Sequence, residues 1–218
     1  MSKDLEKLYD IKSTYGDLFY SISECVNELS QYDIKRFNSG ECFYKNNLST
    51  LKNLMDKIEV TEQEIKDRKF LSKLFKRDNL LENLVKELDK YDQTIDQLIR
   101  CSKCKCFKCV KDCSFNPCVE CKIGSCIMYC DKENYNIRIF DEYIIPLVNN
   151  DTGKESRYRT LCVIEIGHDD KFIFLENLFD KDDKLILEYI PTIRGIEYGE
   201  ITDVELFDKL VSIYKRHS

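Results

Sequence analysis

The sequence predicts an α+β protein in three parts: an N-terminal antiparallel helical bundle or hairpin, a central cysteine-rich zinc module, and a small C-terminal antiparallel β-sheet with a terminal helix. Apolar residues recur three and four positions apart through the first hundred residues, which is the period of a helix face. Nine of the twelve cysteines fall between residues 101 and 130. After residue 130 the pattern alternates and is rich in β-branched and aromatic residues. The expected domains are therefore residues 1–100, 101–130 and 131–218.

The helical region contains three apolar stripes, and each predicts one buried helix face. They comprise Ile11, Tyr15, Leu18, Ile22, Cys25 and Leu29; Leu48, Leu51, Met55 and Ile58; and Leu81, Leu84, Leu88, Tyr91, Ile95 and Leu98. The last stripe has coiled-coil-like spacing. We expect the stripes to pack on one another. The alternative is a helical arm that binds a partner or a second copy of the chain, forming a homo-oligomer.

Two local signals divide the helical region. Ser39 and Gly40 are typical of a break between helices. Thr61 and Glu64 have the spacing of a capping box, which predicts a helix start or a kink near Thr61.

The C-terminal region contains five strand candidates: residues 135–140, 143–148, 158–166, 171–175 and 184–190. Turn residues at 149–153 and 167–170 predict hairpins. Pro146 predicts an edge strand, because proline has no N–H to donate to a neighbouring strand. Thr202 and Glu205 predict the cap of a final helix whose core face is Leu206, Leu210 and Tyr214, with Ile201 and Leu206 as a hydrophobic staple. His168 is expected at a hairpin tip, and His217 at a solvated end.

The nine clustered cysteines predict a metal site. They are Cys101, Cys104, Cys106, Cys109, Cys113, Cys118, Cys121, Cys126 and Cys130. Three C-x2-C pairs stand out, and this spacing lets one turn direct two thiolates at one ion. We expect two zinc ions, and a three-zinc cluster with bridging sulfurs is the alternative. In the expected arrangement the first zinc is bound by Cys101, Cys104, Cys118 and Cys121. The second is bound by Cys106, Cys109, Cys126 and Cys130, and Cys113 is a spare or a bridge.

An iron–sulfur cluster is the main chemical rival, although the bacterial ferredoxin spacing is matched only in part. Disulfides are a weaker rival because the compartment is expected to be reducing. A closed site of cysteines usually folds a peptide and performs no reaction, so the zinc is expected to be structural.

Composition predicts a cytoplasmic protein without a membrane segment. The first ten residues are charged rather than apolar, and no long apolar run is present. The formal net charge is −6, yet residues 101–130 carry five lysines against Asp112 and Glu120. The complete lack of alanine indicates an AT-rich genome, such as that of a low-GC bacterium or its phage.

No phosphate-binding loop or catalytic motif is present in the sequence, so we expect no enzymatic activity. The leading hypothesis is a regulatory zinc-binding protein that docks on a protein partner, for example a phage or mobile-element inhibitor of a host machine. A nucleic-acid-binding protein is the first alternative, using Arg100, Lys103, Lys105, Phe107, Lys108, Lys111, Phe115 and Lys122. An iron–sulfur redox protein or a metal sensor is the second alternative.

Overall fold

The computed structural model describes residues 3–38, 42–71, 80–111, 113, 115, 123–149, 152–167, 170–192 and 195–217. The chain forms two compact units. The helical unit comprises Met1–Lys103 and Phe107–Val110, and the sheet unit comprises Cys104–Cys106 and Lys111–Ser218. A helical N-terminal region and an antiparallel sheet with a terminal helix confirm the predicted mixture of elements.

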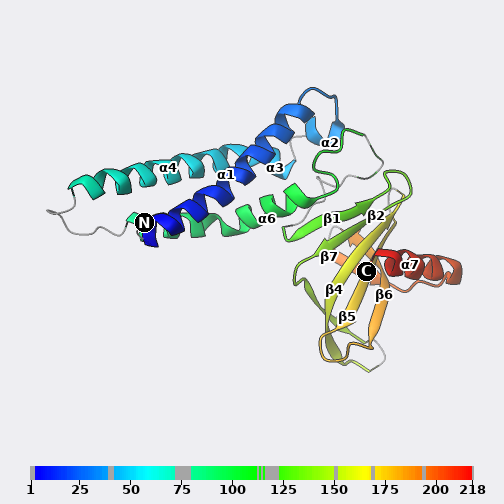
Figure 1. The fold of residues 1–218 in the computed structure, drawn as a ribbon. Coiled ribbons are helices and arrows are strands. Elements are labelled where there is room, and N and C mark those ends of the chain that lie inside the picture. Colours follow the sequence, from blue (N-terminus) through cyan, green and yellow to red (C-terminus); the bar gives the residue numbers. More distant parts are fainter. Residues whose placement is uncertain are drawn as a thin grey trace. The chain divides into compact units, whose positions relative to one another are not determined.

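The helical unit is built around two long helices, α1 and α4, and a third, interrupted helical rod (Figure 1). Its elements are α1 (Lys3–Leu29), α2 (Lys35–Asn38), α3 (Phe43–Asn46), α4 (Leu48–Leu71), α5 (Leu80–Leu88), the 3₁₀ turn η1 (Asp89–Tyr91) and α6 (Asp92–Lys103). Helix α1 packs on α4 and α6, and α4 packs on α5. Among the described residues, no helix has both the length and the apolar content needed to cross a bilayer.

The predicted stripes face the interior of this unit. Side chains from all three long segments are almost completely buried, including Ile22, Leu29, Leu51, Ile58 and Leu98. Burying each such side chain contributes about 1.5–3 kcal/mol relative to its exposed state. The third stripe is continuous across α5, η1 and α6, because the 3₁₀ turn keeps the chain helical between them.

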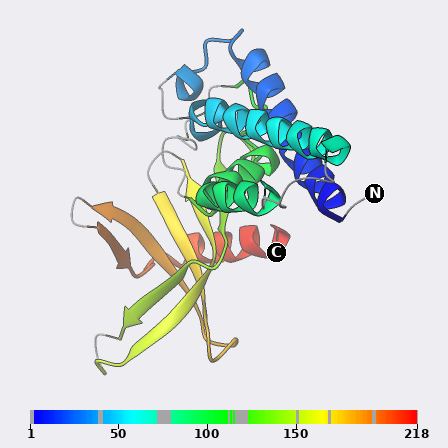
Figure 2. The ribbon, with the colours of Figure 1, turned by 90° about the vertical axis from the view of Figure 1, so that its left-hand side faces the viewer.

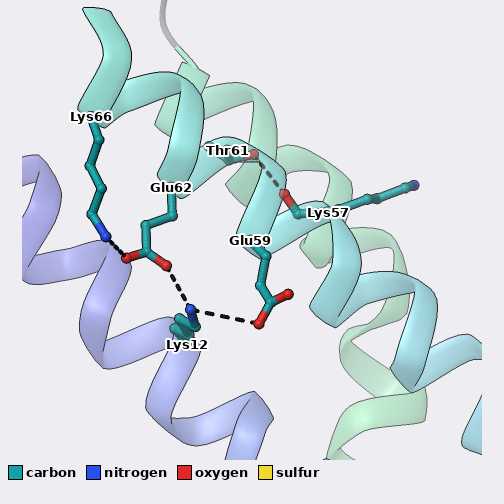
Figure 3. A network of polar contacts seen from close by, with 6 residues as sticks. All are labelled: Lys12, Lys57, Glu59, Thr61, Glu62 and Lys66. Atoms are coloured by element: carbon teal, nitrogen blue, oxygen red, sulfur yellow. Dashed lines mark hydrogen bonds and ion pairs between the residues drawn. The ribbon is translucent and has the colours of Figure 1, made fainter. Parts of the chain in front are cut away.

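Of the two alternatives predicted near Thr61, a helix start or a kink, the helix start is wrong. Helix α4 runs without interruption from Leu48 to Leu71. The Thr61 hydroxyl donates to the Lys57 carbonyl at 2.9 Å, one turn earlier in the same helix (Figure 3). A threonine inside a helix can satisfy its hydroxyl in this way, so the capping-box spacing alone did not identify a helix end.

A charged network joins α1 to α4 beside Thr61 (Figure 3). The Glu62 carboxylate is 7% exposed and accepts hydrogen bonds from Lys12, at 2.7 Å, and from Lys66. Lys12 also approaches Glu59 at 3.7 Å. The hydrogen bonds from Lys12 and Lys66 outweigh burial and hold the pKa of Glu62 below its usual value.

Replacing Glu62 by glutamine is expected to lower the free energy of unfolding at pH 7 by about 1 kcal/mol, because both lysines are partly solvated and water screens the ion pairs. The folded-state pKa of Glu62 is lowered. Its contribution is therefore present above the unfolded-state pKa and is lost as the pH falls through the folded-state pKa. Urea unfolding at pH 7 and pH 3 measures this, with the exposed Glu59→Gln variant as the control. Equal losses for both variants, or a loss that persists at pH 3, would contradict the account.

The sheet unit is a seven-stranded antiparallel sheet with one helix (Figure 1). Its elements are β1 (Ser125–Cys130), β2 (Tyr135–Phe140), β3 (Ile144–Val148), β4 (Glu155–Ile166), β5 (Asp170–Asn177), β6 (Lys184–Thr192), β7 (Gly195–Gly199) and α7 (Val204–His217). The strand order is β1-β2-β4-β5-β6-β7, and β3 also pairs with β4. The five predicted strands are confirmed, whereas β1 and β7 were not predicted.

Strands β2 and β3 act as one interrupted strand alongside β4. β2 pairs with residues 163–166 of β4, and β3 pairs with residues 155–159. The chain bends between them at Glu142, which has a positive φ of 48°. Thr160 N donates to the Tyr143 carbonyl, and Asn149 N donates to the Lys154 carbonyl. The backbone N–H and C=O groups of alternate residues, Tyr143, Ile145, Leu147 and Asn149, therefore point toward β4. The backbone of Pro146 points away from β4, to the side of β3 that pairs with no strand. This confirms the predicted edge position.

The two faces of the sheet bury different apolar clusters. Helix α7 covers one face, where Leu210 and Ile213 pack on Ile137, Ile164 and Phe172. The opposite face gathers Ile145, Tyr158, Val163, Ile173, Leu175 and Tyr189. Figure 2 shows the twist of the sheet with α7 against one side of it. Because both faces are apolar, β4 and β5 have nearly continuous buried runs rather than a simple alternation.

The cap of α7 lies one residue later than predicted. Asp203, not Thr202, accepts hydrogen bonds from the backbone N–H groups of Glu205, at 2.9 Å, and Leu206, at 3.2 Å. Ile201 and Leu206 both pack against the α7 core, and so do the predicted Leu210 and Tyr214.

We expect Asp203→Ala to lower the free energy of unfolding by about 1 kcal/mol, because two N–H groups of the first helical turn lose their acceptor. Thr202→Ala is the matched neighbour and should have a clearly smaller effect. Denaturant midpoints of the two variants make the comparison. If the threonine variant were the more damaging one, the assignment of the cap to Asp203 would be wrong.

His217 is not a solvated end, contrary to the prediction. Its ring lies 4.1 Å from the Tyr129 ring, and its Nε2 lies 3.2 Å from the Tyr135 hydroxyl. These contacts attach the last turn of α7 to β1 and β2. His168 lies outside the described residues.

Candidate metal centre

The structure distributes the clustered cysteines over several local environments. Cys101 lies near the end of α6, in the helical unit. Cys109 lies in the Phe107–Val110 segment, which belongs to the same unit. The sheet unit contains Cys104, Cys106, Cys113, Cys126 and Cys130. Cys118 and Cys121 lie outside the described residues, and so does Lys122. The cysteines in the described part of the chain form no disulfide.

Cys104 and Cys106 lie along the edge of β1. Lys105 N donates a hydrogen bond of 2.9 Å to the Ile127 carbonyl. The Cys104 sulfur accepts hydrogen bonds from the backbone N–H groups of Cys106 and Ile127. The short C-x-C segment therefore covers the side of β1 that β2 does not occupy. All of these groups belong to the sheet unit.

This environment favours the thiolate form of Cys104. The Cys106 thiol donates to the Cys104 sulfur, and the two backbone N–H groups and the Arg138 charge add to its effect. Together they outweigh burial and lower the pKa of Cys104 from 9.0 to about 6. A cysteine with this pKa is mainly ionised at neutral pH. The thiolate is the form of cysteine that binds metals and acts as a nucleophile.

Cys126 and Cys130 point to opposite faces of the sheet. Cys126 lies opposite Ile139, and Cys130 lies opposite Asn136. Directly opposed residues share a face, and residues three apart along a strand do not. A register shift between Ile127 and Tyr129 causes the reversal, because residues four apart would share a face in a regular strand. The predicted set of Cys106, Cys109, Cys126 and Cys130 would need both the Cys126 and the Cys130 side chains to reach one ion, so it stays a prediction that this strand register does not favour.

Within the described ranges, no three cysteine, histidine or carboxylate side chains converge as a metal site would require. Cys104 and Cys106 form a pair of adjacent sulfurs, which is half of a tetrahedral zinc site. The predicted pairing gives these two cysteines to different zinc ions and stays a prediction, while the structure has the Cys106 thiol beside the Cys104 sulfur. Their contact favours one shared ion or a shared cluster.

The three cysteines outside the cluster have different chemistry. The Cys25 thiol donates to the Phe107 carbonyl at 3.0 Å, and the Tyr44 hydroxyl donates to the same carbonyl at 3.3 Å. Burial raises the pKa of Cys25 to about 11 and that of Cys162 to about 12. These two thiols therefore stay protonated, as buried structural side chains do. Cys42 is buried at the start of α3.

The aromatic part of the nucleic-acid alternative does not fit the structure. Phe107 and Phe115 are 5% and 2% exposed, so neither ring can stack on a base. Lys108 forms an ion pair of 3.0 Å with Glu24. The other described basic residues of that prediction are Arg100, Lys103, Lys105 and Lys111. Of these, Lys103, Lys105 and Lys111 are exposed and Arg100 is half-buried.

Two residues of the candidate site were not recognised in the sequence. Ile127 contributes its backbone to the Cys104 segment, and no side-chain pattern indicates that role. Arg138 lies between Ile137 and Ile139, both of which pack on the α7 core. A charged residue in the middle of an apolar strand was the available signal.

Comparisons with protein-family models, with curated proteins and with solved structures found no match.

Proposed function

We propose that this chain is a non-enzymatic zinc-binding protein whose metal has a structural role and whose surfaces dock on a protein partner. The observation that carries the metal assignment is the Cys104–Cys106 pair, held against β1 with a thiolate stabilised by backbone N–H groups. Backbone N–H donors fix the orientation of a ligating sulfur and offset its charge, as outer-shell groups do in metal sites.

Zinc suits this donor set better than the harder divalent cations. Thiolates are soft ligands that select zinc, copper(I) or iron–sulfur clusters, whereas magnesium and calcium prefer oxygen. A tetrahedral zinc ion needs four ligands, and Cys104 and Cys106 supply two. The sequence spacing provides the others from the remaining clustered cysteines, and we retain about two zinc ions per chain as the expected content.

A site closed by four thiolates has no open position for water or substrate, so it stabilises structure rather than performing a reaction. Binding by such a site contributes to folding, because the ligands are not preorganised in the unfolded chain. We therefore assign the function to the exposed surfaces of the protein, which would bind the protein partner. Phe179, Val204 and Tyr20 are large apolar or aromatic residues that are at least 70% exposed, and exposed side chains of this type are common in protein interfaces.

Elemental analysis and an absorption spectrum of protein purified without oxygen test the proposal. We expect about two zinc ions in a colourless chain. Visible absorption with bound iron would assign the cysteines to an iron–sulfur centre, and the metal would then have a redox role in place of a structural one. Protein that contains no metal, and that takes up none from a zinc buffer under reducing conditions, would contradict the assignment.

A further inference from the structure

Strands β1, β3 and β7 each lack a neighbouring strand on one side. Such edges pair readily with other chains, and proteins block them with covering segments or prolines. The Cys104–Cys106 segment covers the open side of β1 through the hydrogen bond from Lys105 N to the Ile127 carbonyl. On the open side of β3, Pro146 has no N–H to donate. Strand β7 contains no proline, and no described segment lies along its open side.

The backbone of β7 presents hydrogen-bonding groups along this edge. Thr192 of β6 pairs with Gly195 of β7 across a two-residue connection, so the two exchange hydrogen bonds. Hydrogen-bonded pairs alternate along an antiparallel ladder, so Glu197 also bonds to β6. The N–H and C=O groups of Ile196 and Tyr198 therefore point away from β6. Within the described ranges, no residue bonds to these groups.

The two faces of β7 differ in chemistry. Ile196 and Tyr198 pack in the apolar cluster on the sheet face opposite α7. On the other face, Glu197 is exposed. Glu188 of β6 lies beside it, because a Cβ added to Gly199 would be only 2.9 Å from the Glu188 carboxylate. Neither carboxylate forms an ion pair with a described residue, so one face of the edge is apolar and the other is acidic.

We propose, on the basis of the docking function proposed above, that an extended segment of the partner protein adds to the sheet as a strand beside β7. Its apolar side chains lie opposite Ile196 and Tyr198, and a lysine or arginine between them lies opposite Glu197. Opposite charges placed directly across a strand pair stabilise it. In this mode of binding the main-chain hydrogen bonds supply affinity, and the alternating side chains supply specificity.

A second copy of the chain does not fit this edge. A symmetric pair of β7 strands is antiparallel. If it uses the backbone groups of both Ile196 and Tyr198, it aligns Ile196 of one copy with Tyr198 of the other. The two Glu197 side chains then lie directly opposite each other, and like charges in that position destabilise the pair. The edge therefore selects a basic segment of another protein.

The probe is a short capped peptide in which valine and lysine alternate, and the same peptide with glutamate in place of lysine is its control. Amide hydrogen exchange of the native chain is measured with and without each peptide. We expect the lysine peptide at saturation to slow exchange at Ile196 and Tyr198 about tenfold or more, because their N–H groups gain an acceptor. Exchange at Ile144 and Val148, on the open side of β3, should not change, because Pro146 interrupts that edge.

A charge exchange separates strand pairing from general attraction. Glu197→Lys should lose the response to the lysine peptide and gain a response to the glutamate peptide. Glu133→Lys makes the same charge change at an exposed residue between β1 and β2, and should respond like the native chain. Ile196→Pro removes an N–H that points away from β6, so this variant should fold and lose the response at Tyr198.

No slowing by the lysine peptide at millimolar concentration would overturn the proposal. Equal slowing by both peptides would overturn it, and so would an undiminished response in Ile196→Pro. A native dimer already protected at Ile196 and Tyr198 would assign the edge to a second copy instead. Zinc content of the same samples is a separate readout. A peptide response in a chain without zinc overturns only the metal assignment, and zinc without a peptide response overturns only the role of β7.

Discussion

Replacing Cys104 by serine is expected to remove about one zinc ion per chain and leave the rest bound. The reason is the position of its sulfur, which receives hydrogen bonds from Cys106 and Ile127 and is the described thiol whose pKa is lowered. A serine hydroxyl stays protonated at neutral pH and is a poor zinc ligand. Zinc content per chain, measured after gel filtration under reducing conditions, reports the loss.

Cys162→Ala is the matched control for this change. Cys162 lies in the same unit and is buried, and burial raises the pKa of its thiol to about 12. Its loss leaves a small cavity in the α7 core and is expected to cost about 1 kcal/mol of stability without any loss of zinc. A full zinc content in Cys104→Ser, or an equal zinc loss in both variants, would contradict the proposed site.

Removing zinc with a strong chelator is expected to release the Cys104–Cys106 segment from β1. Two hydrogen bonds attach that segment to β1. Lys105 N donates to the Ile127 carbonyl, and the Ile127 N–H donates to the Cys104 sulfur. Amide hydrogen exchange at Lys105, Cys106 and Ile127 should become about tenfold faster or more, because local opening no longer requires release of the metal.

The central strand β5 provides the internal control for this experiment. Ile173 is completely buried and is paired on both sides, with Val163 and Leu187. Its exchange should change little when the metal is removed, because its protection depends on the two apolar clusters of the sheet. If Ile173 and Lys105 lost protection together, the metal would support the whole unit. If neither changed, the segment would be held without metal.

Much of the fold follows from apolar periodicity. The stripes of the helical unit are present because burial of one helix face imposes the helical period. The five strands are marked instead by β-branched and aromatic residues, since β4 and β5 bury both faces. Local signals were less reliable. Thr61 has capping-box spacing but lies inside α4, and the cap of α7 is Asp203 rather than Thr202. Several residue types can cap a helix, so two neighbouring candidates such as Thr202 and Asp203 are hard to tell apart from the sequence.

The candidate site shows a different limit of sequence analysis. Cysteine spacing predicts metal binding but says nothing of the face on which each cysteine lies, because the reversal between Cys126 and Cys130 depends on a register shift in β1. That shift is a property of the β1–β2 pairing and leaves no mark in the order of the cysteines. Strand β1 itself was missed because the cysteines within it were interpreted only as ligands. The hydrogen bond from the Ile127 N–H to the Cys104 sulfur likewise depends on the folded sheet.

X-ray absorption at the zinc edge of the native protein identifies the atoms that surround the metal. We expect zinc bound by about four sulfur atoms at roughly 2.3 Å. Cys104→Ser should lower the zinc content while the remaining zinc keeps its sulfur ligands. A first shell of nitrogen or oxygen at roughly 2.0 Å would contradict the account, because the metal would then lie away from the Cys104–Cys106 pair.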